Sequence, residues 1–256
     1  PESSHPIDAF IRHRLEKTNL HPSDEAPRAT LIRRLSLDLT GIPPTPEETA
    51  AFLHDTTPGA YDRVVDRLLA SPHYGERMAW DWLEAARYAD SNGYQGDSER
   101  TMWPWRDWVI DSINRNIPYD QFVTLQLAGD IIPGATDDTR LATAFHRNTM
   151  TNTEGGTSDE EFRTAAVKDR IQTTVQGLMG ITVQCAQCHT HKYDPFTHTD
   201  YFRLFAIFNN TADNDLIDES PVLVLFTTDK KKVWNLLYCQ FAAIQPTLSA
   251  RTTRAV

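Results

Sequence analysis

Residues 158–179 read SDEEFRTAAVKDRIQTTVQGLM and carry the strongest helix-start signal in the chain. It opens on Ser158 followed by three acidic residues. This combination starts helices, because the serine oxygen accepts a free backbone N–H and the acids favour the positive helix end. Apolar side chains then recur every four residues, at Val167, Ile171, Val175 and Met179. That period places them on one face, so the sequence predicts a long amphipathic helix.

Helical patterns of the same kind, separated by proline and glycine, run through most of the chain. They cover residues 7–20, 28–39, 46–53, 61–69, 72–86, 104–113, 119–128 and 201–208. A capping box from Thr45 to Glu48 marks one clear start, with Pro46 at the first helical position. Only Val222 to Phe226 is typical of a strand. We therefore expect an all-α fold, an irregular multi-helix bundle with a short strand-like C-terminal segment.

The length of 256 residues allows one large domain or two small ones. A soft boundary is expected near residue 135, in the loop 133–138. It would separate an N-terminal helical part, 1–135, from a second helical part, 136–221, followed by an atypical tail, 222–256. All three parts can equally form one domain. Because the chain begins at Pro1, we expect it to be a piece of a longer protein.

Composition excludes several classes of protein. With 40% apolar and 23% charged residues the chain is too apolar to be disordered. Its longest apolar run, residues 222–226, is far shorter than the ~20 residues of a membrane span. The net charge of -10 repels phosphate backbones, so nucleic acid is not an expected partner. A basic protein or a neutral ligand is easier to accommodate.

Residues 185–189 read CAQCH, which is the attachment spacing of c-type haem. Thiols three residues apart on a helical turn can reach both vinyl groups of one porphyrin edge. His189 is then carried to the proximal iron position. No Asp, Glu, Lys or Arg lies between Arg170 and Lys192, so we expect this segment to be buried and to form a haem pocket. Six aromatic residues that follow could close over the ring: Tyr193, Phe196, Tyr201, Phe202, Phe205 and Phe208.

Three other interpretations of this motif stay open. Zinc could use Cys185, Cys188 and either His189 or His191, although the only other cysteine that could belong to a second knuckle is Cys239. A thioredoxin-like redox pair would need a βαβ setting, which the helical pattern does not supply. The third interpretation is a pair of buried cysteines beside a histidine that caps a turn.

The second axial ligand of such an iron is less defined. It must come from the opposite face of the ring, where His191 is poorly placed. Met150 is the first choice, and the alternatives are His146, His198 and Met179. An open position would favour ligand binding or catalysis at iron over electron transfer.

Five of the six tryptophans fall between residues 80 and 108, together with carboxylates such as Asp90 and Asp97. The tryptophans are Trp80, Trp82, Trp103, Trp105 and Trp108. Indole rings stack on sugars and glycoside hydrolysis uses two carboxyl groups, so one hypothesis is a hydrolytic site. The alternative is that Trp82, Trp105 and Trp108 form the core of amphipathic helices.

Five segments of the chain closely resemble the planctomycete cytochrome c domain family. They are PIDAFI from Pro6, TLIRRLSLDLTGIPPTPEE from Thr30, LLASPHYGERMAWDWLEAARYADSNGY from Leu68, AGDIIPGAT from Ala128 and CAQCHTHKYDP from Cys185. The resemblance covers about residues 5–221. It implies an exported protein with a separate cytochrome c-like module before this one and an uncharacterised domain after it, often in a context of polysaccharide breakdown.

Carried over by residue, the resemblance implies that Cys185, Cys188 and His189 attach haem. It also makes residues 191–195 part of the same signature. The tail after Pro221 departs from the family pattern, and Cys239 receives no role.

We therefore expect an exported c-type haem-binding module, periplasmic or at the cell surface, that transfers single electrons. Its expected partner is a redox protein, either basic or another cytochrome c module. The alternative is an enzyme of complex polysaccharide breakdown, oxidative at an open-coordinate haem or hydrolytic at residues 80–108. Whether the chain is an enzyme stays open.

Overall fold

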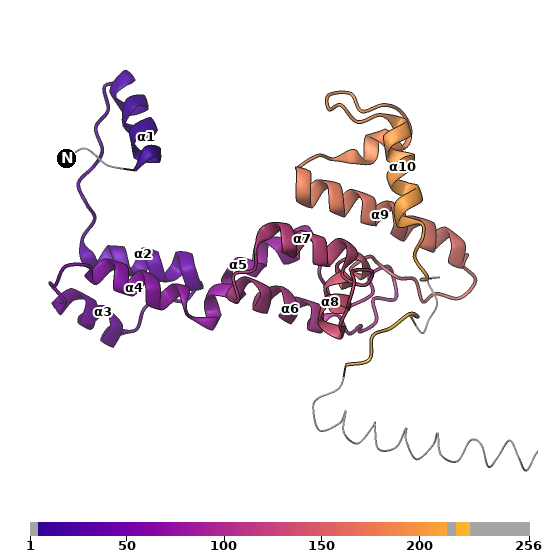
Figure 1. Ribbon diagram of the computed structural model, residues 1–256, viewed down its shortest axis with the longest axis horizontal. Coiled ribbons are helices and arrows are strands. Elements are labelled where there is room, and N and C mark those ends of the chain that lie inside the picture. Colours follow the sequence, from indigo (N-terminus) through magenta and orange to yellow (C-terminus); the bar gives the residue numbers. More distant parts are fainter. Residues whose placement is uncertain (1–4, 214–218, 226–256) are drawn as a thin grey trace, which may run out of the picture. The chain divides into compact units, whose positions relative to one another are not determined.

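The computed structural model describes residues 5–213 and 219–225, and within them the chain is helical and forms no β-strand (Figure 1). The elements are α1 Pro6–Lys17, α2 Arg28–Thr40, α3 Pro46–His54, α4 Ala60–Leu69, α5 Pro72–Ala85, α6 Trp103–Asn114, α7 Tyr119–Ala128, α8 Asp137–Ala142, η1 Thr143–Arg147, α9 Asp159–Met179, η2 Val183–Gln187 and α10 His198–Phe208. The all-α prediction is confirmed. None of the helices described has the length and apolarity needed to cross a bilayer.

The expected helix starts are confirmed by their hydrogen bonds. Ser158 Oγ accepts the backbone N–H of Glu161 at the start of α9. At the start of α3, Thr45 Oγ1 accepts the N–H of Glu48, and the Glu48 carboxylate accepts the N–H of Thr45 in return, at 3.1 and 2.9 Å. At the other end of α9, Gly180 has φ 69°, a left-handed conformation that suits glycine and ends the helix.

Two expectations about local structure differ from what is observed. Residues 222–225 form no strand, and Phe226 lies outside the described residues. The segment 133–138 is not only a loop, because Thr136 caps the short helix α8 through a reciprocal bond pair with Thr139. Six residues carry too little periodicity for α8 to be recognised in the sequence.

The contacts divide the chain into two compact units. The first comprises the described residues up to 80 together with 113–115, and the second comprises the remaining described residues. The soft boundary expected near residue 135 falls inside the second unit. In the first unit, α2, α3 and α4 bury Ile32, Phe52 and Ala60. The Arg28 guanidinium lies 4.0 Å from the centre of the Phe52 ring and donates to two carbonyls at the end of α3.

Aromatic rings build one part of the second unit. Trp108 stacks on Phe122 with 5.7 Å between ring centres, and Trp82 stacks on Phe145 at the same distance. Trp105 is fully buried and donates its indole N–H to the carbonyl of Ala142 at 3.1 Å. The interpretation of Trp82, Trp105 and Trp108 as packing residues is therefore confirmed.

A second core of the same unit joins α9, η2 and α10. The buried residues come from all three elements: Val167, Ile171, Val175, Val183, Ala186 and Tyr201. Three of them lie on the α9 face that the four-residue period predicted. The fourth residue of that period, Met179, is instead 61% exposed.

A buried ion pair lies beside this core. Arg170 is 2% exposed, and its guanidinium makes two hydrogen bonds to Asp213 and one to the carbonyl of His146. Burial by itself raises the pKa of Asp213, but the hydrogen bonds and charge of Arg170 outweigh this effect and hold it well below its usual range. The last charge before the uncharged segment is therefore fixed by a partner 43 residues away.

A pair of glycines tests the packing of the second unit. A Cβ at Gly129 would collide with the carbonyl oxygens of Thr139 and Leu125, whereas a Cβ at Gly177, inside α9, would meet nothing within 4 Å. We expect Gly129→Ala to lower the free energy of unfolding by about 3 kcal/mol because backbone must move. Gly177→Ala should raise it by about 0.5–1 kcal/mol through helix propensity. Urea denaturation measures both, and a tolerated Gly129→Ala would contradict the packing of α7 against α8.

Candidate functional site

The CxxCH sequence lies in the connection between α9 and α10. Its backbone forms a tight turn, because the N–H groups of Cys188 and His189 both donate to the carbonyl of Cys185 at 3.3 Å. Ala186 is buried against α9 and α10, together with Val183. The side chains of Cys185 and Cys188 are exposed free thiols. Both cysteines of the turn are thus exposed to solvent, while Ala186 at its middle is buried in the core.

The uncharged segment is less buried than the sequence suggested. From Gln176 to Thr190 only Val183 and Ala186 are buried, and His189 is exposed. The expectation of an enclosed segment is confirmed for residues 171–175, where Ile171 and Val175 are in the core, and is wrong for residues 176–190, which form the helix end and a surface turn. The aromatic residues that follow behave in two ways. Tyr201 is buried, whereas Tyr193 is 82% exposed.

The ring of His189 is oriented by its own neighbour. Its Nδ1 atom lies 2.8 Å from the carbonyl oxygen of Thr190. A carbonyl only accepts hydrogen bonds, so Nδ1 carries the proton and Nε2 keeps a free lone pair. A backbone carbonyl on one ring nitrogen is the usual arrangement for a histidine that binds metal through the other.

His191 has the opposite arrangement. Its Nδ1 atom accepts the backbone N–H groups of Tyr193 and Asp194, at 3.3 and 2.9 Å. The backbone N–H of His191 donates to the carbonyl of Phe196 at 2.8 Å, and the Asp194 carboxylate lies 3.3 Å from Nδ1. These contacts make His191 a residue that closes the turn 191–196. They account for the place of His191 in the HTHKYDP signature.

The start of α10 contacts the CxxCH turn directly. Thr197 and Asp200 form a capping box, with the N–H of Asp200 donating to Thr197 Oγ1 at 3.1 Å. The next residue, His198, lies with Nδ1 3.0 Å from the carbonyl of Ala186. Its ring meets Phe202 edge-on, with 4.9 Å between ring centres. The imidazole therefore bridges α10 and the middle of the motif.

Tyr201 lies beneath the turn. It is 1% exposed, and its hydroxyl has no hydrogen-bond partner. Burial raises the pKa of Tyr201, and the negative charge of a nearby Cys188 thiolate acts in the same direction. The phenol is thus held neutral.

Met150 lies away from the turn. Its side chain packs against the backbone of Gly93, where a Cβ would come within 2.6 Å of it. The neighbouring Tyr94 meets Phe162 edge-on, near the start of α9. The CxxCH turn packs instead on the second half of α9, a helix about 30 Å long. The structure therefore does not bring Met150 together with His189.

The ring of His146 is also engaged in contacts other than with the CxxCH turn. Its ring packs against Phe145 and Phe208 and hydrogen-bonds to the backbone of Leu127. Burial, followed by the positive charge of Arg170, lowers the pKa of His146 to about 4. The imidazole is thus buried in its neutral form.

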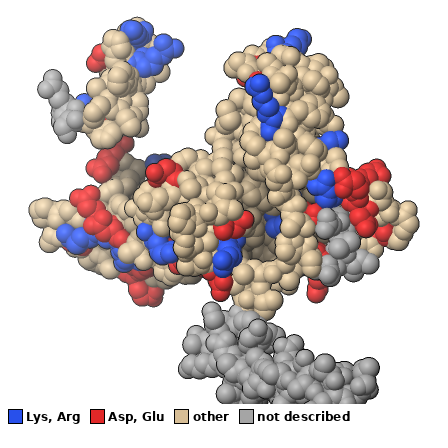
Figure 2. Space-filling model, turned by 45° about the vertical axis from the view of Figure 1, so that its right-hand side comes forward, with Lys and Arg blue, Asp and Glu red and all other residues tan. Residues whose placement is uncertain are grey.

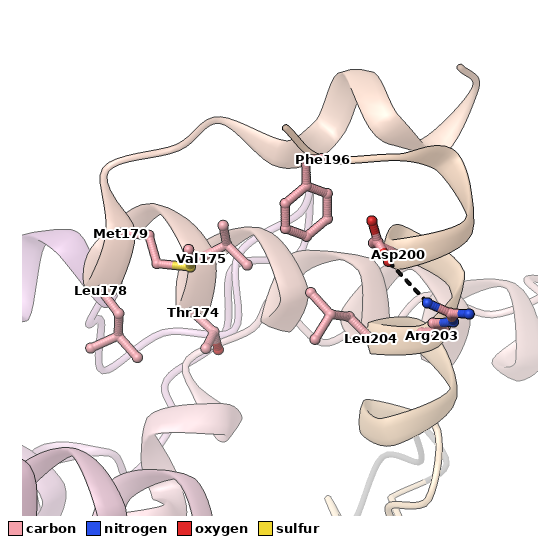
Figure 3. Close-up of a pocket in the computed structure, with 8 residues that line it drawn as sticks. All are labelled: Thr174, Val175, Leu178, Met179, Phe196, Asp200, Arg203 and Leu204. Atoms are coloured by element: carbon pink, nitrogen blue, oxygen red, sulfur yellow. Dashed lines mark hydrogen bonds and ion pairs between the residues drawn. The ribbon is translucent and has the colours of Figure 1, made fainter. Parts of the chain in front are cut away.

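Met179, the remaining methionine considered, lines a cavity of about 380 Å³ between α9 and α10 (Figure 3). Apolar side chains from both helices and from Phe196 line the cavity, and the ion pair of Asp200 with Arg203 lies at one end. Neither cysteine nor His189 belongs to the lining.

In the described part of the chain, no three His, Cys, Asp or Glu side chains form a group suited to a metal ion.

The carboxylates of the tryptophan-rich region accept hydrogen bonds within the loop that precedes α6. Asp90 accepts the N–H groups of Met102 and Trp103 at the start of α6, and its second oxygen accepts the hydroxyl of Tyr88. Asp97 accepts the N–H of Gly93 at 3.0 Å. Both acids are thus engaged in local structure.

Sequence patterns singled out His198 and Tyr201 but not their role in supporting the turn. The contact of His198 with Ala186 and the burial of Tyr201 depend on how α10 folds back on α9. The four-residue capping-box pattern from Thr197 to Asp200 is visible in the sequence and marks the start of α10 correctly. No sequence signal pairs Arg170 with Asp213.

The fold and the site define an all-α protein with an exposed CxxCH turn held between two helices. Residues 6–213 match the model of the family PSCyt2, described as "Protein of unknown function (DUF1549)". The chain belongs to this family. The match confirms the planctomycete-type family resemblance, while haem binding stays a prediction. Searches of curated proteins and of solved structures found no match.

The buried imidazole of His146 predicts a pH dependence. Because its folded-state pKa of about 4 lies below the ordinary 6.5, the unfolded chain binds the proton first as pH falls. The contribution of His146 to the free energy of unfolding is therefore fully present above pH ~6.5. It falls by about 3 kcal/mol as the pH is lowered to ~4. Denaturation at several pH values should show this loss in the wild type and a smaller one in His146→Leu. His54→Leu, at an exposed histidine, is the control. Equal pH dependence in all three proteins would contradict this assignment.

Proposed function

We propose that this chain is an exported c-type haem-binding module that transfers single electrons. The observation that carries the proposal is the pairing of two free, exposed thiols on one turn with an imidazole whose Nε2 lone pair is available. These are the donors that c-type haem requires, in the required order along the chain.

The chemistry of the donor set fits covalent attachment. Each thiol, at Cys185 and Cys188, would add across one vinyl group, so that sulfur bonds to one vinyl carbon and the hydrogen goes to the other. The addition needs no oxidant or reductant and loses no atom. Because both side chains are solvent-exposed, the thiols are accessible to a porphyrin without unfolding the core beneath the turn.

His189 would bind the iron through Nε2 while Nδ1–H stays on the carbonyl of Thr190. When bound, the haem supplies a one-electron couple, with one electron moving between its iron and the iron or cofactor of a redox partner protein. Haem attachment belongs to compartments outside the cytoplasm, so we place the protein in the periplasm or at the cell surface.

The charge around the turn bears on the partner. Residues 171–210 contain two acidic and two basic residues, although the whole chain has a net charge of -10. In Figure 2 the upper part of the α9–α10 region carries few charged side chains. A partner that docks near the turn would meet a nearly neutral surface, so salt would affect association less than the net charge suggests.

Maturation of variants tests the attachment. The wild type, expressed with a cytochrome c maturation system and export signal, should give the pyridine haemochrome spectrum of a haem with two thioether bonds. Cys185→Ala or Cys188→Ala should shift that spectrum, because one vinyl group remains conjugated, and the double variant should carry no covalent haem. His189→Ala should retain thioethers where it matures and bind added imidazole.

The third cysteine supplies the matched control for these variants. Cys239→Ala should mature as the wild type does. A colourless wild type, or equal loading of the double variant, would reject the proposed function.

A further inference from the structure

The imidazole of His198 contacts the CxxCH turn from outside it. Nδ1 lies 3.0 Å from the carbonyl oxygen of Ala186, so the ring donates and Nδ1 carries the proton. His198 is the first residue of α10, and the capping box of Thr197 and Asp200 fixes this end of the helix. The donor therefore reaches the turn from a fixed point.

The acceptor of this bond is in the middle of the motif. Ala186 directly follows Cys185, and its side chain is fully buried. The carbonyl of Cys185 already accepts the N–H groups of Cys188 and His189, which closes the turn internally. The bond from His198 adds what the internal bonds cannot supply, which is the orientation of the whole turn relative to α10.

The underside of the same turn is fixed by packing. Tyr201 lies one helical turn after His198 and belongs to the core that contains Ala186 and Val183. Phe202 supports the His198 ring from the side. Hydrogen bond and packing together set the direction in which the two exposed sulfur atoms project.

We infer that His198 is a positioning residue for haem attachment, acting through the Ala186 carbonyl on the two thiols. This inference rests on the proposed function. A porphyrin presents its vinyl groups at a fixed separation, so both additions succeed only when both sulfur atoms project toward the same ring edge. Without the donor, the turn can rotate on its core, and one thiol reaches a vinyl group while the other does not.

Four variants separate positioning from general stability. His198→Gln keeps a side-chain N–H that can reach the carbonyl, and His198→Leu removes the donor. His54 is the matched control, because its Nδ1 also lies on a backbone carbonyl, that of Ala50 at 2.7 Å, but in the first unit. His54→Leu and His54→Gln therefore remove or replace an equivalent bond away from the motif. Each protein is matured with the same haem-attachment system.

Two readouts report on the thioether bonds themselves. In His198→Leu the ratio of doubly to singly linked haem, read from the pyridine haemochrome band, should fall about fivefold, the population ratio that one ordinary hydrogen bond maintains. Mass spectrometry of the motif peptide after alkylation should give the same ratio, because only the singly linked form keeps a free thiol that gains the mass of the alkyl group. His198→Gln should restore it, and both His54 variants should equal the wild type. Circular dichroism checks that each variant is folded.

The outcomes distinguish this inference from the proposed function. A wild type with two thioethers and an unchanged ratio in folded His198→Leu overturns the positioning role alone. Failure of His198→Gln to restore the ratio has the same meaning, because the effect would then not come from the donated hydrogen bond. A wild type without covalent haem overturns both.

Discussion

The burial of one face of α9 against η2 and α10 is the constraint on which the site depends. A 3₁₀ turn of five residues has too few hydrogen bonds to be stable by itself. Val183 and Ala186 gain that stability by packing on Ile171 and Val175, and Tyr201 completes the contact from α10. Burial of the inner residues leaves the two cysteines outside, because side chains next to each other on a turn project in different directions. The same apolar contact thus holds the turn in place and leaves its two cysteines exposed.

The absence of charge around an exposed turn has a physical consequence. Surface segments ordinarily carry charged residues, yet residues 176–191 carry none, and the exposed side chains there include Met179. The nearest preceding charge, Arg170, is buried in an ion pair with Asp213 and does not reach the turn's surface. A neutral surface of this kind suits an apolar ring that would cover part of it, which is the arrangement the proposed haem requires.

Sequence patterns predicted the parts of this protein that depend on local chemistry. The face of α9, the caps at Ser158 and Thr45 and the all-α class follow from period and hydrogen-bonding capacity, and the structure has them. The burial of the uncharged segment was predicted correctly for residues 171–175 and wrongly for residues 176–190, because lack of charge alone does not distinguish a core segment from an exposed turn. The separation of Met150 from the motif also could not be predicted from the sequence. It depends on tertiary packing, because the loop that contacts Met150 packs near the start of α9, whereas the motif packs near its end.

Covalent haem attachment is tested by the mass of the wild-type chain after export through a haem-attachment pathway, measured intact and after tryptic digestion. We expect an added mass equal to one whole haem, with no hydrogen lost, located on the peptide that contains Cys185, Cys188 and His189. A folded chain of unmodified mass with both thiols open to alkylation would contradict it.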